Sequence, residues 1–252
     1  MILTVDIGNS RIKWALWMVE RIVDRGVINY GAYKKMEAFD QLFSAVQKPE
    51  KIFAVCVAGD EMRQLLVDWV SQKWQLEVDF LKTQKRYKHI TNAYKDPGQH
   101  GADRWAAVVA GHQLYPDAAV CVISAGTALT FDLINNDGRH LGGYILPSYM
   151  TMHKALMSDT AGINAGSDVQ LSEQGVPDNT SDAVNVGLHK MLQAGIREIC
   201  QLASQKMGDS MRIIITGGGA KNILSYPGMP SMECKPDLIM QGLYNIKMQR
   251  DA

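Results

Sequence analysis

The sequence predicts an α/β protein composed of two similar halves. Short apolar runs of strand length alternate with longer segments in which apolar residues recur at helical spacing. One pattern occurs twice: residues 5–10 and residues 123–128 are both apolar runs that lead into a glycine followed by a small polar residue. Each copy is followed by further alternating segments, which are typical of strands in a meander. A chain that repeats one β-rich unit in this way is expected to form two related sheets.

Length and composition exclude several classes of protein. At ~150 residues per domain, 252 residues correspond to one or two domains. The 26 Lys and Arg residues balance 26 Asp and Glu residues, so the chain has no bulk field for a polyanion and we expect no nucleic-acid partner. Charge-free stretches such as residues 118–131 fall short of the ~20 residues that a membrane span needs, and Asp6 interrupts the apolar start where a signal peptide would continue. We therefore expect a cytoplasmic protein with no membrane partner.

The first half, residues 1–117, reads as β-β-β-α-β-α followed by a loop and a helix. The predicted elements are strands at residues 2–7, 12–18, 22–28 and 52–57, helices at residues 36–46 and 62–70, a loop at residues 82–101, and a helix that carries Trp105. The first three strands are expected to form a meander with a tight turn after Ile7.

The second half, residues 118–252, repeats the meander and then changes to a long helix. The predicted elements are strands at residues 119–123, 129–133, 141–146 and 211–215, a turn at residues 135–138, and helices at residues 181–207 and 237–248. We expect a Ser or Asp side chain to cap the long helix. The two halves, each resembling ribonuclease H, are expected to pack their sheets around a central cleft.

The end of the first strand has the residues that a phosphate site needs. Asp6 can hold Mg2+ directly or through its waters, and Gly8 lets a phosphate approach the backbone. Asn9 and Ser10 are small and polar, and Lys13 can neutralise phosphate charge. The alternative is an ordinary hairpin turn with a capping Asp.

Two later glycine turns extend this interpretation. Gly126 and Thr127 offer N–H groups and a hydroxyl to a second phosphate, and Gly217, Gly218 and Gly219 lie between a strand and a helix start, where an adenosine can lie flat against the backbone. In this order they predict the two phosphate loops and the adenosine loop of an actin-like ATPase, the fold of acetate kinase, Hsp70 and actin. The chain has neither a P-loop nor a dinucleotide-binding signature.

A fourth motif, Gly101, Ala102, Asp103 and Arg104, opens the helix in the middle of the chain. A helix N-terminus favours anions, while the adjacent acid and base provide a proton acceptor and a partner for a carboxylate. The alternative is a helix-capping Asp beside a solvent-exposed Arg.

Together these motifs resemble the ordered set of type III pantothenate kinases, over residues 2 to about 245. The resemblance rests on five groups of residues: Asp6, Gly8, Asn9, Ser10 and Lys13; Gly101 to Arg104; Gly126, Thr127, Ala128, Thr130 and Asp132; Gly142, Gly143, Tyr144, Ile145 and Pro147; and Asn179, Thr180 and Ala183. It implies an enzyme that phosphorylates pantothenate with ATP, in the first step of coenzyme A synthesis, and that works as a homodimer.

The resemblance also implies roles for individual residues. The stretch from Asp6 to Lys13 binds ATP phosphates and metal, Thr127 adds a phosphate contact, and Asp103 is the general base. Tyr94, Gly101, Ala102, Asp103, Arg104 and Thr180 line the pantothenate pocket. One position departs from the family: Ser124 stands where an Asp usually helps to bind a monovalent cation, K+ or NH4+. The resemblance therefore implies a cation site that Ser124 places in doubt.

Other residues and functions stay open at this stage. The basic run of Lys82, Lys85, Arg86, Lys88 and His89 is a solvated loop or an anion guide. His100 adjoins the predicted base but reads as a loop residue. The four cysteines, at 56, 121, 200 and 234, have no metal-ligand spacing and are expected to be reduced and buried. The alternative functions are another small-molecule kinase of this fold and a non-catalytic ATP-binding regulatory protein.

Overall fold

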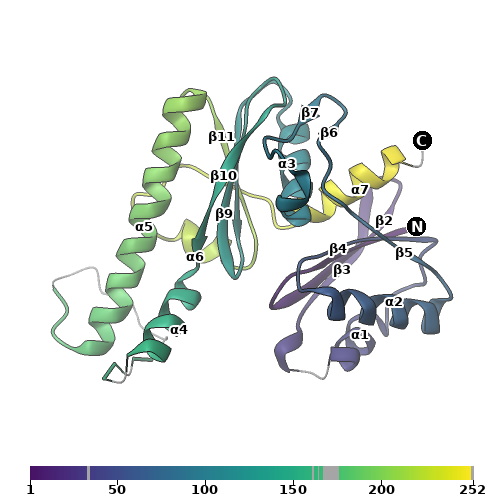
Figure 1. The fold of residues 1–252 in the computed structure, drawn as a ribbon, viewed down its shortest axis with the longest axis horizontal. Coiled ribbons are helices and arrows are strands. Elements are labelled where there is room, and N and C mark those ends of the chain that lie inside the picture. Colours follow the sequence, from purple (N-terminus) through teal and green to yellow (C-terminus); the bar gives the residue numbers. More distant parts are fainter. Residues whose placement is uncertain (33–34, 161, 164, 167–175, 251–252) are drawn as a thin grey trace. The chain divides into compact units, whose positions relative to one another are not determined.

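The computed structural model describes residues 1–32, 35–160, 162–163, 165–166 and 176–250, and this part of the chain forms two compact units (Figure 1). The first unit contains Met1–Pro116, Asp137–Gly142 and Asp237–Ala252, and the second contains Asp117–Asn136 and Gly143–Pro236. Each unit holds one five-stranded sheet within the described residues. The first junction between the units follows Pro116, one residue before the boundary expected from the sequence, but residues 137–142 and 237–252, expected in the second half, belong to the first unit.

The sheet of the first unit has the strand order β3-β2-β1-β4-β5. Its strands are β1 (Ile2–Ile7), β2 (Arg11–Met18), β3 (Arg21–Asn29), β4 (Lys51–Cys56) and β5 (Val78–Phe80). The β1–β2 and β2–β3 pairs are antiparallel, as the predicted meander requires, whereas β4 lies parallel to β1 and β5 parallel to β4. The parallel pairs are connected through helices, because a hairpin turn cannot join parallel neighbours.

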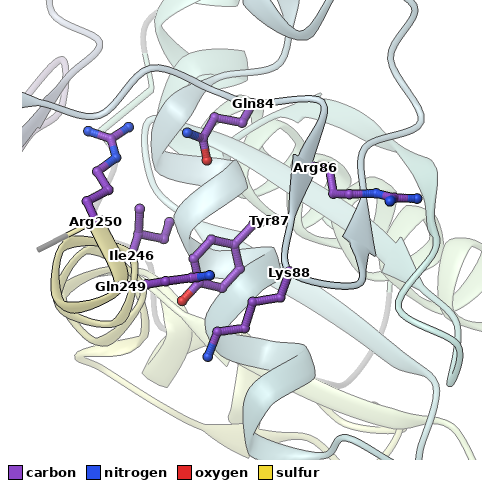
Figure 2. A pocket seen from close by; sticks show the side chains of 7 residues that line it. All are labelled: Gln84, Arg86, Tyr87, Lys88, Ile246, Gln249 and Arg250. Carbon is purple, nitrogen blue, oxygen red and sulfur yellow. The ribbon is translucent and has the colours of Figure 1, made fainter. Parts of the chain in front are cut away.

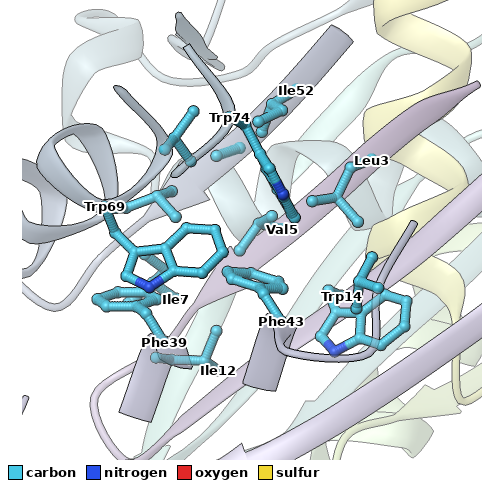
Figure 3. Close-up of a cluster of buried hydrophobic side chains, with 14 of the residues drawn as sticks. Leu3, Val5, Ile7, Ile12, Trp14, Phe39, Phe43, Ile52, Trp69 and Trp74 are labelled. Carbon is cyan, nitrogen blue, oxygen red and sulfur yellow. The ribbon is translucent and has the colours of Figure 1, made fainter. Parts of the chain in front are cut away.

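Alternation along β1 divides its side chains between the two faces of this sheet. Leu3, Val5 and Ile7 are fully buried in a core with residues of α1 (Lys35–Phe43) and α2 (Asp60–Trp74). Figure 3 shows the aromatic part of this core, where the Trp69 and Trp74 rings meet edge to face with centroids 4.8 Å apart. Burial of these large side chains is the main force that fixes the register of β1.

The opposite face of the sheet carries Thr4 and Asp6 and packs against two helices, α3 (Ala102–Leu114) and α7 (Leu238–Arg250). The Thr4 hydroxyl lies 3.3 Å from the sulfur of Met240 in α7. The two helices cross in backbone contact, because a Cβ placed on Gly242 would lie 2.0 Å from the carbonyl oxygen of Ala106. Residues from the end of the chain therefore complete the layer that carries the Gly101–Arg104 motif.

The segment between α2 and α3 contains short elements: β6 (Arg86–Tyr87), β7 (Ile90–Thr91) and a single 3-10 turn (Pro97–Gln99). A return segment from residue 137 joins this region, since the Thr91 amide donates to the carbonyl oxygen of Gly138 at 2.9 Å. Gly138 has a φ of 77° at the predicted turn, and a side chain there would also collide with the His89 ring.

The sheet of the second unit has the order β10-β9-β8-β11-β12, which repeats that of the first unit. Its strands are β8 (Val120–Ala125), β9 (Ala128–Ile134), β10 (His140–Pro147), β11 (Arg212–Thr216) and β12 (Glu233–Cys234), and its helices are α4 (Tyr149–Asp159), α5 (Thr180–Met207) and α6 (Ala220–Leu224). β8 pairs antiparallel with β9 and parallel with β11, as β1 does with β2 and β4. The predicted duplication of an α/β unit is confirmed.

Several details differ from the sequence prediction. The strand β5 and the helices α4 and α6 were not predicted, and the cap of α5 is neither Ser nor Asp: the side chain of Asn179 accepts a hydrogen bond from the Asp182 amide at 3.0 Å. Cys121 and Cys200 are buried as expected, but Cys56 is only partly buried and Cys234 is exposed, so packing does not account for the Cys234 thiol. In the described ranges, every helix is too short or too polar to cross a bilayer.

Candidate functional site

Asp6, from the predicted first phosphate loop, is buried on the α3 side of the first sheet. It lies directly opposite Lys13 in the β1–β2 ladder, so the two side chains share one face. Burial, and next the negative charge of Asp103, raise the pKa of the Asp6 carboxyl from an ordinary value of 3.8 to about 7, although Lys13 acts in the opposite direction. The structure therefore brings the phosphate-loop acid and the predicted general base within electrostatic reach of each other.

The loop between β1 and β2 is a hairpin turn, as the alternative interpretation also requires. The Gly8 amide donates to the carbonyl oxygen of Arg11 at 3.0 Å, and the Tyr30 hydroxyl donates to the carbonyl oxygen of Gly8 at 2.9 Å. Asn9 and Ser10 are exposed at its tip. The turn geometry is compatible with phosphate binding, because these hydrogen bonds fix the base of the turn and leave Asn9 and Ser10 exposed at its tip.

The Gly101–Arg104 motif forms the first turn of α3. Gly101 is the N-cap residue, and Ala102 begins the helix. A Cβ on Gly101 would lie 2.7 Å from Oδ1 of Asp103, so the absence of a side chain gives this carboxylate its place over the helix start. Asp103 thus stands in the first turn, where the positive end of the helix dipole favours negative charge.

Arg104 is buried, with 6% of its surface exposed. Its Nη1 donates to the Tyr94 hydroxyl at 3.2 Å. The alternative interpretation, a capping Asp beside a solvent-exposed Arg, is wrong for the arginine. A guanidinium held below the surface beside a tyrosine hydroxyl is suited to binding a carboxylate in a fixed direction.

Sequence reasoning missed two residues around Tyr94. Asn92 is buried beside the His100 ring, and His140 comes from the return segment at the start of β10. A single Asn such as Asn92 has no distinctive sequence pattern, and His140 is far from Tyr94 along the chain. His100 lies in the loop before α3, as expected, and it is buried in the same cluster.

In the second unit, the predicted second phosphate loop and the adenosine loop lie next to each other, at the carboxyl ends of β8 and β11. Ser124 pairs with Thr216 at the ends of the parallel strands β8 and β11. Gly217 has a φ of 95°, and a Cβ there would lie 2.4 Å from the carbonyl oxygen of Ala125, so only glycine fits. The Gly219 amide donates to that same oxygen at 3.0 Å. Two glycine turns at the carboxyl ends of adjacent strands form a compact surface of backbone groups, as the loop prediction requires.

The remaining predicted residues of this unit lie around that edge or at the start of α5. Thr127 and Gly218 are exposed, and the carbonyl oxygen of Thr127 accepts a hydrogen bond from Thr151 of α4 at 2.8 Å. Thr180 is the exposed first residue of α5, directly after the capping Asn179.

Ser124 offers a hydroxyl where the resemblance implies a carboxylate. It lies directly opposite Thr130 in the β8–β9 ladder. Oγ1 of Thr130 is buried and has no hydrogen-bond partner within the described residues. The two side chains supply neutral hydroxyl oxygens. Oxygen is a suitable ligand atom for a hard monovalent cation, but these oxygens lack the negative charge that would bind the cation tightly.

The basic run lies on the surface and does not converge on a site. Lys82, Lys85, Arg86, Lys88 and His89 are all exposed. Two of them border a pocket of about 250 Å³ whose other lining residues are Gln84, Tyr87, Ile246, Gln249 and Arg250. In Figure 2 Arg86 points away from Tyr87. The Arg250 guanidinium lies 5.1 Å from the centroid of the Phe53 ring, and its Nη1 lies 3.6 Å from Oδ1 of Asp79. The run has the properties of the solvated loop.

Comparisons with known proteins agree with the motif set. A family model described as type III pantothenate kinase matches residues 2–202. A type III pantothenate kinase from Nitrosococcus oceani is 33% identical over 250 residues, which cover 98% of this chain and 93% of that protein.

Two solved structures are similar in fold. A conserved Baf family protein from Campylobacter jejuni has a TM-score of 0.62 at 23% identity, covering 99% of this chain and 98% of that one. The activator of 2-hydroxyisocaproyl-CoA dehydratase from Clostridium difficile, with bound ADPNP, has a TM-score of 0.56 at 12% identity, covering 99% and 96%. At these identities the likeness shows the fold alone, which is that of the actin-like ATPases.

Proposed function

Because the chain belongs to the type III pantothenate kinase family, we propose that it transfers the γ-phosphoryl group of ATP to the hydroxyl of pantothenate, giving 4'-phosphopantothenate for coenzyme A synthesis. One observation carries this proposal within the first unit. Asp6 of the phosphate loop lies on the face of the first sheet that packs against α3, the helix whose first turn carries Asp103, and burial together with the Asp103 charge raises the pKa of the Asp6 carboxyl. The proposed phosphate-binding residue and the proposed general base thus lie on the same side of the first sheet.

Asp103 acts as the general base in this mechanism. Phosphoryl transfer to an alcohol needs positioning and charge neutralisation more than covalent catalysis, together with a carboxylate that takes the hydroxyl proton. Asp103 stands at the helix start, where the dipole favours its charged form. Lys13, directly opposite Asp6 in the ladder, places a positive charge next to the phosphate loop.

Asp6 fits a divalent metal ion. A carboxyl oxygen is the ligand that Mg2+ prefers, and burial raises the pKa of the Asp6 carboxyl, so a nearby cation would favour its charged form. When bound, Mg2+ supplies the positive charge that neutralises the phosphate oxygens of ATP. We propose that Asp6 holds this ion, directly or through water, and that Gly8, Asn9 and Ser10 border the phosphates.

The pantothenate carboxylate is proposed to bind Arg104. The guanidinium presents a planar set of donors, and its burial strengthens a charge-assisted pair. Tyr94 borders the same pocket and accepts a hydrogen bond from Arg104, which orients the guanidinium plane toward the substrate. Gly101, Ala102 and Thr180 are proposed as further lining residues.

The nucleotide is proposed to use the second unit as well. Thr127 contributes a phosphate contact, and Gly217 and Gly218 form the adenosine surface. The close contact between Gly217 and Ala125 supports this role, because a side chain there would displace the backbone that the adenosine approaches. A monovalent cation near Ser124 is proposed to bind weakly, since Ser124 and Thr130 supply no negative charge.

The protein is further proposed to be a homodimer through its second unit. α5 buries one face, yet Met191 on this helix is 55% exposed. Tyr144 and Ile145 of β10 and Met150 of α4 are 43%, 63% and 46% exposed. We propose that a second copy of the chain covers these apolar side chains, which lie on the edge strand of the sheet and on two helices.

A coupled assay of ADP release tests the proposed function. Purified protein with Mg2+ and ATP should release ADP when pantothenate is added. ADP release with a hexose instead of pantothenate would favour another small-molecule kinase of this fold. ATP binding without turnover on either acceptor would favour a non-catalytic regulatory protein.

A further inference from the structure

Three aromatic rings of the first unit lie in nearly parallel planes. The Tyr94 and His100 centroids are 4.7 Å apart with an interplanar angle of 9°, and those of His100 and His140 are 4.8 Å apart at 6°. Tyr94 and His140 are also nearly parallel, at 6.2 Å and 4°. All three separations are those of interacting aromatic pairs. The rings form a single stacked cluster, in which Tyr94 and His100 come from the segment before α3 and His140 comes from the start of β10.

Hydrogen bonds fix the orientation of the two imidazoles. The side-chain oxygen of Asn92 accepts from the Tyr94 amide at 3.0 Å, which turns the Asn92 nitrogen toward Nδ1 of His100, also at 3.0 Å. Nδ1 of His100 is thus an acceptor, and its ring proton lies on Nε2. The Ala93 amide points to Nδ1 of His140 at 3.4 Å, which gives this ring the same tautomer. Both rings are therefore held in place before any substrate binds.

Tyr94 depends on such neighbours for its position. It lies in a segment without helix or strand structure and is only partly buried, so regular backbone hydrogen bonds do not fix the position of the ring. Its hydroxyl nevertheless accepts the hydrogen bond from Arg104, whose guanidinium is also 6.0 Å from the Tyr94 ring centroid. The position of the Tyr94 ring therefore contributes to holding the Arg104 guanidinium in place.

We propose that His100 and His140 are positioning residues for substrate binding: they stack against Tyr94, which fixes its hydroxyl and, through it, the Arg104 guanidinium. The inference rests on the proposed function, in which Arg104 binds the pantothenate carboxylate. Neither histidine takes part in proton transfer in this view. Their contribution is confined to the affinity for the acceptor substrate, while ATP binding and the chemical step depend on other residues.

Two substitutions at His140 distinguish the contribution of ring stacking from that of the Nδ1 hydrogen bond. His140→Leu and His140→Phe both remove the Nδ1 acceptor, but only His140→Phe keeps an aromatic face for stacking. Relative to wild type, His140→Leu should raise the KM for pantothenate about 3- to 10-fold, the effect expected for one aromatic pair, with kcat and the KM for ATP within twofold. His140→Phe should restore most of the affinity. Lys82→Ala, at an exposed residue of the same segment between α2 and α3, is the control and should leave all three constants unchanged.

A double-mutant cycle with Tyr94→Ala completes the test. In the Tyr94→Ala background, His140→Leu should have no further effect on the KM for pantothenate, since its action passes through the tyrosine. Equal shifts in the KM values for pantothenate and ATP, equal effects of Leu and Phe, additive effects in the cycle, or loss of the fold in His140→Leu would each overturn the inference. Absence of turnover in the wild type would instead overturn the proposed function, so the two failures are distinguishable.

Discussion

Replacing Asp6 with Asn should make the metal-free protein more stable at alkaline pH. The Asp6 carboxyl has a pKa of about 7 in the folded protein, against 3.8 for an ordinary Asp, because it is buried and lies near Asp103. A raised carboxyl pKa means that ionisation is harder in the folded state than in the unfolded chain. Its contribution to stability is therefore fully present below pH 3.8 and is lost as pH rises to about 7.

The size of the effect follows from the pKa difference. Each pKa unit corresponds to about 1.4 kcal/mol, so the two units between pH 5 and pH 7 amount to about 3 kcal/mol. The amide of the Asp6→Asn variant does not titrate, which removes this loss. The free energy of unfolding of Asp6→Asn minus that of the wild type should thus grow by about 3 kcal/mol between pH 5 and pH 8. Comparing two pH values cancels any pH-independent effect of the amide on packing.

Urea titration of the metal-free protein in EDTA measures this difference. Asp117→Asn, at an exposed carboxyl, is the matched control and should show a constant difference from wild type. A difference for Asp6→Asn that stays constant or shrinks with rising pH would refute the interpretation of Asp6 as a buried, poorly compensated carboxyl. Mg2+ with a non-hydrolysable ATP analogue should stabilise the wild type and have little effect on the variant.

The remaining predictions concern catalysis, binding and packing. Asp103→Asn should lower kcat by ~10²- to 10⁴-fold with pantothenate binding retained, and stopped-time ADP assays would show a structural role if kcat stayed within a few-fold. Arg104→Gln should raise the KM for pantothenate by ~10- to 100-fold and leave that for ATP unchanged. Gly242→Ala should destabilise the protein by about 3 kcal/mol in urea titration, because a Cβ would lie 2.0 Å from the Ala106 oxygen. Ser124→Asp should increase the ratio of rates in K+ and Na+ buffers, and an unchanged ratio would contradict the neutral-site interpretation.

The strands of the two meanders could be predicted closely because their side-chain alternation is strong. Residues 2–7 were assigned to a strand with the bounds that the structure has, since Leu3, Val5 and Ile7 need a buried face. The helix α4 could not be found in this way. It buries only Met152 and His153, so its apolar spacing is weak, and the Ser148 cap that begins it was the one available signal.

The candidate site could be predicted only where it consists of local motifs. Glycines at tight turns and the acid–base pair at a helix start have short-range signatures, so the sequence marks Gly8, Gly217 and Asp103 as candidates, and the structure places them at a hairpin turn, a strand end and a helix start. The surroundings of Tyr94 depend on contacts between distant segments. His140 reaches the Tyr94 loop because residue 138 pairs with Thr91, and no periodic pattern in the sequence specifies that pairing.

The helix α7 links the site to the last described part of the chain. It lies against α3 and β1, the elements that carry Asp103 and Asp6, although the whole sequence of the second unit separates it from them. Contact at Gly242 brings the two helix backbones together, so small changes there shift the helix that holds the predicted base. The first unit can complete its core only after residues 238–250 have been synthesised, and contacts over such sequence separations form slowly because loop closure must precede them. We therefore expect the layer that carries Asp103 to be completed late in the folding of the first unit, because it depends on a segment that carries none of the motifs.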